Sequence, residues 1–304
     1  MLSDIHGNLP ALEAALTDAR SCQPDMYLFL GDYIRDCPWP NEVARLIRGL
    51  PNAVVIRGNN EGYLRSMRHE DQATWVHDQY SLIYWNYRAL TSENLEYLAA
   101  LPETAQIEDS GETIRLSHTS SIFHRKPKLR LFHTSGYRAL RETKPFSHEE
   151  YLKIARAAVI ECENAYNEML ALPKGVYLFG HSHLQFHMEM DGRWFINPGS
   201  CGISLDFDNT AAYAILERTS GGWRVEERRV TYDVDGTVRR LRASGLHTDA
   251  PAWCRIIEQQ LLTAKEYMSP FLMHVEETAR RLGEQKRPVS NEVWSEAVKN
   301  WRMD

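Results

Sequence analysis

Five short polar loops, each preceded by apolar residues, constrain the fold of this chain more than any other feature. The apolar runs at residues 26–30 and 53–56 read as buried strands, and they lead into Gly31-Asp32 and Gly58-Asn59. Side chains at the carboxyl ends of such strands meet at one edge of a sheet. The five loops together offer seven side chains that can bind metal ions, namely Asp4, His6, Asp32, Asn59, His118, His181 and His183.

The order of apolar runs and helical patterns predicts an α/β fold. Residues 9–21 carry apolar side chains at helical spacing, and a strand, a helix at 40–50 and a second strand follow. This alternation favours parallel strand pairing with helical crossovers. Strand signals stop near residue 235. We therefore expect one domain over residues 1–232 and a C-terminal helical extension over residues 233–304, packed on the core or on a partner subunit.

Further elements follow from caps, turns and breakers. The patterns predict helices at 71–101 with Ser92 as N-cap, at 147–170 with Ser147 and Glu150 as a capping box, at 252–283 with a kink or break at Pro270, and at 290–301. Residues 211–217 and 223–230, joined through Gly221-Gly222, predict a hairpin.

Composition narrows the class of protein. The chain has 304 residues, a formal net charge of −6 and five scattered cysteines without a Cys-x-x-Cys pair. The acidic balance argues against a general nucleic-acid or anionic-membrane binder, and the cysteines suit reduced thiols. No apolar stretch approaches the roughly 18–20 residues that span a bilayer, and no signal-peptide pattern is present. We expect a cytoplasmic protein with no membrane segment and no platform for nucleic acid.

The spacing within the loops supports a shared site. Asp4 and His6 are separated by one residue, as are His181 and His183, so each pair points to one side of an extended loop. One such pair is weak evidence, but the five loops reinforce one another because each lies at the same end of its expected strand. Imidazoles combined with carboxylates favour manganese, iron, cobalt or zinc over magnesium or calcium.

These motifs resemble the calcineurin-like metallophosphoesterases. The matching residues are Asp4-x-His6, Gly31-Asp32, Gly58-Asn59, Ser117-His118, Gly180-His181-x-His183 and Asn197-Pro198-Gly199-Ser200, in the right order over about residues 3–217. The start of the chain is similar to a bacterial phosphodiesterase and phosphatase branch that begins Ser-Asp-Ile-His-Gly-Asn-Leu-Pro-Ala-Leu. The resemblance implies a four-layer αββα sandwich with mixed sheets, and it does not cover the tail.

The resemblance also implies a dinuclear centre. Asp4, His6, Asp32 and His183 would hold one metal ion, and Asp32, Asn59, His118 and His181 would hold the other, with Asp32 bridging. The cofactors would be two divalent transition-metal ions, with manganese as first choice and iron, zinc, cobalt or nickel as alternatives. A bridging hydroxide would attack the phosphorus atom, and Asn59 and His118 would help the metals to stabilise the charge on the phosphoryl oxygens.

One catalytic position departs from the family pattern. Many relatives have a histidine after Gly-Asn that acts as general acid for the leaving group, and this chain has Asn60 there. Asparagine donates a hydrogen bond but cannot deliver a proton. Loss of a positioned acid costs about 10²–10⁴-fold for poor leaving groups. We therefore expect good leaving groups, or substrates that supply their own proton.

Two arginines are candidates for substrate binding. Arg35 follows the Gly31-Asp32 loop and either contacts a phosphate group or faces water beside Asp36. Arg125 belongs to a basic segment at residues 124–133, which is either solvated surface or a lid that grips a second phosphate or a nucleotide. The sequence does not separate Arg125 from Lys126 or Lys128.

Only three residues precede Asp4, whereas a buried strand usually needs about 5–6. Either the strand is truncated or the natural product starts upstream of Met1, and we favour the second.

The expected function is metal-dependent hydrolysis of a small phosphomonoester or phosphodiester. The alternatives are a dinucleoside polyphosphate hydrolase, whose basic segment holds the extra phosphates, and a non-catalytic metal-binding scaffold. The C-terminal helices are a candidate surface for homo-oligomers.

Overall fold

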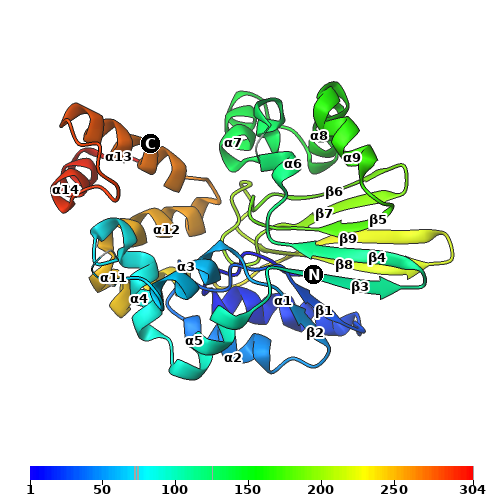
Figure 1. Ribbon diagram of the computed structural model, residues 1–304, viewed down its shortest axis with the longest axis horizontal. Helices are drawn as coiled ribbons and strands as arrows, with labels where there is room; N and C mark the ends of the chain where they lie inside the picture. Colours follow the sequence, from blue (N-terminus) through cyan, green and yellow to red (C-terminus); the bar gives the residue numbers. More distant parts are fainter. Residues whose placement is uncertain (72, 74, 125, 304) are drawn as a thin grey trace.

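Two β-sheets face each other in the computed structural model, and helices cover both outer faces (Figure 1). The structure describes residues 1–71, 73, 75–124 and 126–303. The larger sheet has the order β3-β4-β5-β7-β6, and two-stranded pairs are formed by β1 with β2 and by β8 with β9. The strands are β1 (Tyr27–Phe29), β2 (Ala53–Val55), β3 (Thr104–Asp109), β4 (Glu112–Ser117), β5 (Gly175–Leu178), β6 (Gln185–Met190), β7 (Arg193–Pro198), β8 (Ala211–Thr219) and β9 (Gly222–Val230).

The two short pairs are joined through the first two residues. Leu2 forms a parallel bridge with Phe29 of β1, and Met1 exchanges backbone hydrogen bonds of 2.8 and 3.1 Å with Ala214 of β8. β1 and β2 are parallel, as predicted from the alternation of strand and helix. The chain before Asp4 thus makes one bridge in place of the strand expected there. The expectation of residues upstream of Met1 stays a prediction.

Three hydrophobic clusters define the layers. Leu12, Leu16 and Val43 pack helices against Phe29 of β1 on one outer face. A second cluster fills the space between the sheets, and a third lies under the helices that cover the larger sheet. The covering helices are α1 (Leu9–Ser21), α2 (Pro40–Arg48) and α5 (Ser92–Ala100) on one side, and α6 (Ser121–His124), η3 (Pro127–Phe132), α7 (Thr134–Thr143), α8 (His148–Glu161) and α9 (Glu163–Ala171) on the other. The predicted four-layer αββα sandwich is confirmed.

The helix predictions hold where the local signal is strong. The helix at residues 9–21 is confirmed, and Ser147 caps α8 in a capping box with Glu150. The continuous helix at 71–101 was wrong, because this region holds η2 (Asp78–Tyr80), α4 (Ser81–Ala89) and α5. Thr91 rather than Ser92 caps α5, since its hydroxyl accepts from the Asn94 amide at 3.3 Å. The helix expected at 147–170 is interrupted at Cys162.

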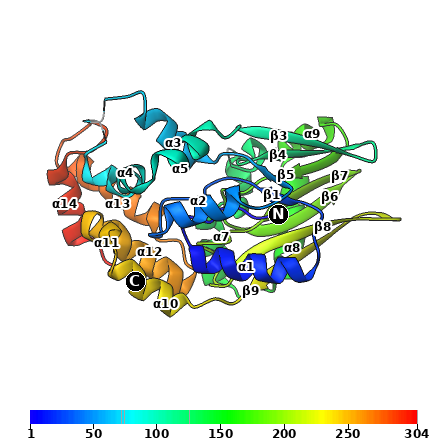
Figure 2. The same cartoon turned by 90° about the horizontal axis from the view of Figure 1, so that it is seen from below.

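The C-terminal helices lie together at one end of the molecule (Figure 2). They are α10 (Val234–Arg242), α11 (Gly245–Asp249), α12 (Pro251–Thr263), α13 (Met268–Arg281) and α14 (Asn291–Asn300). The predicted break is real but misplaced, because the chain turns at Ala264, which has a φ of +50°. Pro270 lies in the first turn of α13, where its missing N–H is not needed. Their core includes Leu82 and Leu205. The boundary at residue 232 and a homo-oligomer through these helices stay predictions.

Among the described residues, no helix is both long and apolar enough to cross a bilayer. All five cysteines are free thiols, and Cys22 alone is exposed.

Helix α3 (Asn59–Met67) begins at the polar loop that follows β2 and runs away from it. It is the element that places Asn59, and it forms one wall of the candidate site.

Candidate metal centre

Six of the seven predicted ligands gather into two groups. Asp4, His6 and His183 form one group, and Asp32, His118 and His181 form the other. Within each group the potential ligand atoms lie within 4.8 Å of one another. Four of these side chains are at most 4% exposed (Asp4, His6, Asp32 and His118), whereas His181 is the exposed member. Each group therefore converges on one small volume with one open side.

The ligand loops have unusual backbone geometry. Five of the seven predicted ligands have left-handed φ values between 52° and 68°, namely Asp4, His6, Asp32, His181 and His183. Residues other than glycine rarely adopt this conformation, which costs on the order of 1–3 kcal/mol each and concentrates at functional sites. The strain is distributed over three separate loops. This pattern indicates that the fold holds these side chains in place for function.

One carboxylate links the two groups. Asp32 Oδ2 lies 3.9 Å from His6 Nε2 in the first group and 3.4 Å from His118 Nε2 in the second. The other oxygen of Asp32 accepts a hydrogen bond of 2.9 Å from the Asn60 amide, which fixes the carboxylate plane. Ligand atoms about 2.1 Å from a shared ion lie roughly 3–4 Å apart. Asp32 Oδ2 therefore has the position of a bridging ligand.

Asp4 is oriented in a similar way. Its Oδ2 atom accepts from the His181 amide at 2.9 Å, whereas Oδ1 lies 3.7 Å from His6 Nε2 and 3.5 Å from His183 Nε2. These last two separations are too long for hydrogen bonds but suit ligands of one ion. One oxygen of each carboxylate is thus anchored by a backbone amide, and the other faces the imidazoles.

Three imidazoles are oriented through their Nδ1 atoms. His118 Nδ1 lies 2.7 Å from the Leu30 carbonyl oxygen, and His183 Nδ1 lies 2.6 Å from that of Ile203. His6 Nδ1 lies 2.8 Å from Asp36 Oδ2, a close ion-pair contact without hydrogen-bond geometry. Metal-binding histidines usually donate their second ring N–H to a carbonyl or carboxylate in this way. The arrangement leaves Nε2 of all three rings free to bind a cation.

The buried polar atoms of the site fit two cations. Asp4 Oδ1, His6 Nε2, Asn59 Oδ1 and His118 Nε2 are buried, and no hydrogen-bond partner for them exists among the described residues. Burial of a polar atom without a partner costs free energy, so such atoms are rare in folded proteins. Oxygen and nitrogen atoms that are left free and converge are the donor set of a divalent transition metal. The site thus offers candidate ligands for divalent cations.

The charges of the site favour the ligating form of the carboxylates. Burial opposes ionisation of Asp32, but His118 and His6 lower its pKa to about 2. Asp4 behaves alike, because His183, His6 and His118 outweigh burial and lower its pKa. Burial would lower the pKa values of His6 and His118, yet carboxylates raise them to about 10 and about 9. A cation that binds here competes with the protons of these two rings.

The two asparagines of the third loop have different positions. Asn59 is the first residue of α3 and lines both cavities that open onto the site. Asn60 is fully buried, and its Nδ2 atom lies 3.4 Å from the Ile34 carbonyl oxygen. Among the described residues that line the two cavities, Asn60 is absent. Its backbone amide positions Asp32, and the catalytic role assigned to its side chain stays a prediction.

One cavity, of about 320 Å³, is lined by ligands of both groups and is covered on one side by the C-terminal helices. Arg35 lines it, and its Nη2 atom lies 2.8 Å from Met268 Sδ. Asp36 does not face water as considered above, because it is 2% exposed. Gln260, Glu266 and Leu272 of the tail line the same cavity. The tail therefore forms part of the site, and the role of Arg35 in substrate binding stays a prediction.

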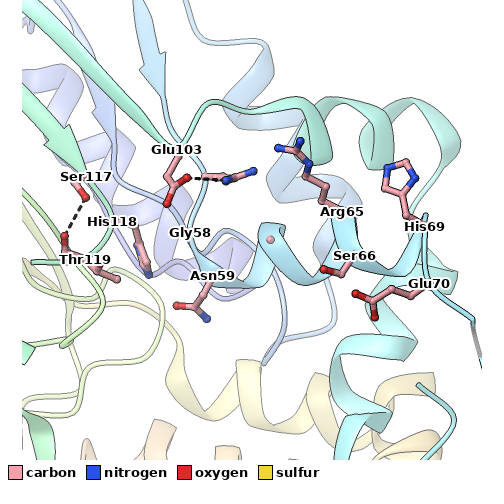
Figure 3. A pocket seen from close by; sticks show the side chains of 12 residues that line it. Gly58, Asn59, Arg65, Ser66, His69, Glu70, Glu103, Ser117, His118 and Thr119 are labelled. Carbon is pink, nitrogen blue, oxygen red and sulfur yellow. Dashed lines mark hydrogen bonds and ion pairs between the residues drawn. The ribbon is translucent and has the colours of Figure 1, made fainter. Parts of the chain in front are cut away.

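The second cavity, of about 630 Å³, opens beside Asn59 and His118 and follows α3 (Figure 3). Arg57 and Arg65 line it, with Glu103 and Glu70 as the acidic members. The side chains in Figure 3 come from α3 and its C-terminal end, from the loop after β4 and from the segment before β3. The centre is thus flanked by one covered cavity and one open groove.

Comparisons with known proteins agree with this geometry. The family model described as calcineurin-like phosphoesterase matches residues 1–198, which is more than half of the chain. The chain belongs to the calcineurin-like phosphoesterase family. It is also 25% identical over 270 residues to the uncharacterized protein MJ0912 of Methanocaldococcus jannaschii, an alignment that covers 83% of this chain and 93% of that protein.

Two solved structures share the fold of this family member. The metallophosphoesterase from Sphaerobacter thermophilus superposes with a TM-score of 0.58 and 24% identity, covering 86% of this chain and 98% of that one. The hypothetical protein PH1004 from Pyrococcus horikoshii OT3 gives a TM-score of 0.58 and 20% identity, with 84% and 95% covered. At these identities the likeness shows the fold, and the predicted bacterial branch stays a prediction.

The basic segment contributes histidines to the site of this phosphoesterase. Arg125 lies outside the described residues. His124 ends α6 and residues 127–132 form η3, and both elements pack on the core through Phe123 of α6 and Phe132 of η3. His124 and His133 line the covered cavity, and the His124 ring lies 4.9 Å from that of His181. Burial, together with the neighbouring histidines, lowers the pKa of His124 to about 3.

Sequence reasoning missed several residues that support the metal centre. Asp36 orients His6, and its position four residues after Asp32 in the same loop was the available signal. Glu61 accepts hydrogen bonds from the amides of Asp32, Tyr33 and Gly58 at 2.8–3.0 Å, so it ties two ligand loops together. Burial and the charge of Asp32 raise the pKa of Glu61 to about 7. No local pattern in the sequence indicated which residues of the C-terminal tail line the site.

Proposed function

We propose that this chain is a metal-dependent phosphoesterase that hydrolyses a small phosphomonoester or phosphodiester at a dinuclear centre. The observation that carries the proposal is the position of Asp32 Oδ2, which faces His6 of one ligand group and His118 of the other. A shared carboxylate oxygen is the device that brings two cations close together. Membership in the calcineurin-like phosphoesterase family supports the same reaction class.

The ligand groups assign a role to each residue. Asp4, His6 and His183 would hold one divalent ion, and Asn59, His118 and His181 would hold the other, with Asp32 shared. Two such ions supply an activated water at neutral pH and positive charge for the phosphoryl oxygens. We favour manganese, with iron, zinc, cobalt or nickel as alternatives, because the donor set mixes imidazoles with carboxylates.

The protein's own residues position the phosphate group. Asn59 begins α3, so the positive end of the helix dipole faces the second ligand group and favours an anion there. Arg35 lines the cavity beside the first group and offers a guanidinium to the phosphoryl oxygens. Because the Asn60 side chain supplies no proton, we expect esters with acidic leaving groups to react faster.

The test is hydrolysis of para-nitrophenyl phosphate and bis-para-nitrophenyl phosphate by protein reconstituted with Mn²⁺. We expect metal-dependent turnover that falls at least about 10³-fold in Asp32→Asn, because the bridging charge is lost. Asp25→Asn, at an exposed carboxylate, is the matched control and keeps full activity. The ratio of diester to monoester turnover then defines the substrate class. Metal binding without turnover of any ester would contradict the proposal and favour the non-catalytic scaffold.

A further inference from the structure

The open groove continues the metal centre along one face of α3. Asn59, Gly62 and Ser66 line it at intervals of three and four residues, which places them on one face of the helix. Arg65 lies six residues beyond Asn59, or roughly 9 Å along the helix axis. A simple monoester does not reach that far. The groove therefore has room for a substrate that extends well beyond the reacting phosphate.

Gly62 keeps the floor of the groove open. A Cβ atom added at this position would meet nothing within 4 Å, so the glycine is not required by packing. Glycine inside a helix costs roughly 1 kcal/mol relative to alanine. The glycine leaves this stretch of the groove clear, and only a side chain larger than that of alanine would fill it.

Arg65 and Glu70 are the charged side chains of the groove that form no ion pair among the described residues. Arg57 forms an ion pair with Glu103 at 2.8 Å. Arg65 is exposed and makes no ion pair with any described carboxylate. In Figure 3 the Arg65 guanidinium extends from α3 toward the Glu103 ion pair, while Glu70 lies beyond the C-terminal end of the helix. A guanidinium that lines the groove without a partner suits an anionic group of the substrate.

We propose that this groove, the α3 groove, is a subsite for a second anionic group of an extended phosphoester, with Arg65 as its ligand. The inference rests on the proposed function, because the reacting phosphate must sit at the metal centre for the second group to reach Arg65. The substrate class is a phosphoester in which another phosphate is joined to the reacting one through a sugar-sized spacer. Simple monoesters then lack one of the binding contacts.

Two substrates with the same leaving group test this subsite. Thymidine 5′-(para-nitrophenyl phosphate) and its 3′-phosphorylated form both release para-nitrophenolate, so the ratio of their kcat/KM values reports the second phosphate. We expect the wild-type enzyme to favour the 3′-phosphorylated ester about tenfold or more, which corresponds to roughly 1.4 kcal/mol. A wild-type ratio near one would overturn the subsite.

Matched variants locate the effect in the groove. Arg65→Gln removes the charge and Gly62→Phe fills the floor, so we expect each to bring the ratio close to one. Arg65→Lys retains part of the preference. Gly62→Ala keeps the ratio because a methyl group leaves the groove open. Arg68→Gln also keeps it, since Arg68 is exposed nearby but does not line the groove. An unchanged ratio in Arg65→Gln would overturn the assignment.

The controls separate this inference from the proposed function. Turnover of para-nitrophenyl phosphate with a ratio of one would leave the proposed function intact and reject the subsite. If no ester reacts, the proposed function fails, and calorimetric titration of the Mn²⁺-loaded protein decides the subsite. Tighter binding of thymidine 3′,5′-bisphosphate than of thymidine 5′-monophosphate, lost in Arg65→Gln, supports it. Equal affinities reject it.

Discussion

The metal centre and the α3 groove meet at Asn59 but are built in opposite ways. A Cβ atom at Gly58 would lie 2.1 Å from Asp32 Oδ1, whereas one at Gly62 would meet nothing within 4 Å. Gly58 and Gly62 are only four residues apart, yet the first position has no room for a side chain and the second has open space beside it. The contrast teaches that the chain fixes the reacting centre by close packing and leaves the surface for the rest of the substrate accessible.

The charged side chains of the metal centre and of the α3 groove also differ, because the first are buried and most of the second are exposed. Asp4 and Asp32 are at most 3% exposed, and each keeps one oxygen anchored and one oxygen free. In the groove, Arg57 pairs with Glu103, whose side chain is 75% exposed. An exposed pair of this kind contributes about 0–1 kcal/mol, so it rearranges around a ligand at little cost. The buried carboxylates are held in fixed places, whereas the exposed charges adapt.

The largest expected effect comes from Gly58→Ala. The new methyl group overlaps the Asp32 carboxylate and the Asp32 amide, which would lie 2.1 and 2.5 Å away. Asp32 must move, so we expect metal affinity to fall by about 100-fold or more, the upper end for disturbed ligand support. Calorimetric titration with Mn²⁺ measures the change. Gly62→Ala is the matched control, and it should bind metal normally and unfold at higher temperature. Equal metal affinity of Gly58→Ala and wild type would show that close packing at Gly58 does not hold Asp32 in place.

A smaller effect is expected at Asp36. Its carboxylate lies 2.8 Å from His6 Nδ1 and orients that ring toward the first ligand group. Asp36→Asn keeps an acceptor but removes the charge, so we expect metal affinity to fall by about 10–100-fold. Elemental analysis after dialysis against graded Mn²⁺ concentrations measures it, with Asp25→Asn as control. A variant that retains wild-type metal content at every concentration would show that His6 is oriented by packing alone.

The smallest effect concerns buried charge away from the metal centre. Glu227 of β9 is 2.6 Å from His187 Nδ1 through a hydrogen bond and also contacts His148, and although burial raises the pKa of Glu227, the two histidines lower it overall. Because the pKa is lower in the folded state, the stabilisation is present above about pH 4.3 and is lost as the pH falls through the folded value. We expect Glu227→Gln to lower the free energy of unfolding by about 1–3 kcal/mol at pH 7.

Urea denaturation of wild type and Glu227→Gln at pH 7 and near pH 3 measures this difference. It should shrink at the lower pH, while metal affinity at pH 7 stays unchanged. If Glu227→Gln also loses metal affinity, metal binding depends on a buried charge outside the metal centre. The contrast between the fixed centre and the rest of the molecule then does not hold.

Much of the fold could be predicted from patterns among neighbouring residues. The apolar runs ending at Gly31 and Gly58 and the helical spacing of residues 9–21 are properties of neighbouring residues, and the structure confirms the elements they predict. β3 and β6 were missed. The two faces of β3 are both partly exposed, so it lacks a marked apolar pattern, and β6 lies close to the ligand loop that precedes it.

The parts of the site that could not be predicted depend on contacts between distant residues. Arg35 and Met268 are 233 residues apart, and nothing local indicates which residues of the tail border the first ligand group. His124 reaches His181 only because α6 packs on the larger sheet. The burial of Asn60 likewise follows from the packing of α3, whereas the motif alone placed it at the substrate.

The central claim is that Asp32 is shared by two cations, and anomalous X-ray diffraction from crystals grown with Mn²⁺ tests it most directly. We expect two peaks about 3.5–4 Å apart with Asp32 Oδ2 between them. One peak should contact Asp4, His6 and His183, and the other Asn59, His118 and His181. A single peak, or two peaks that leave Asp32 without a metal contact, would contradict the account.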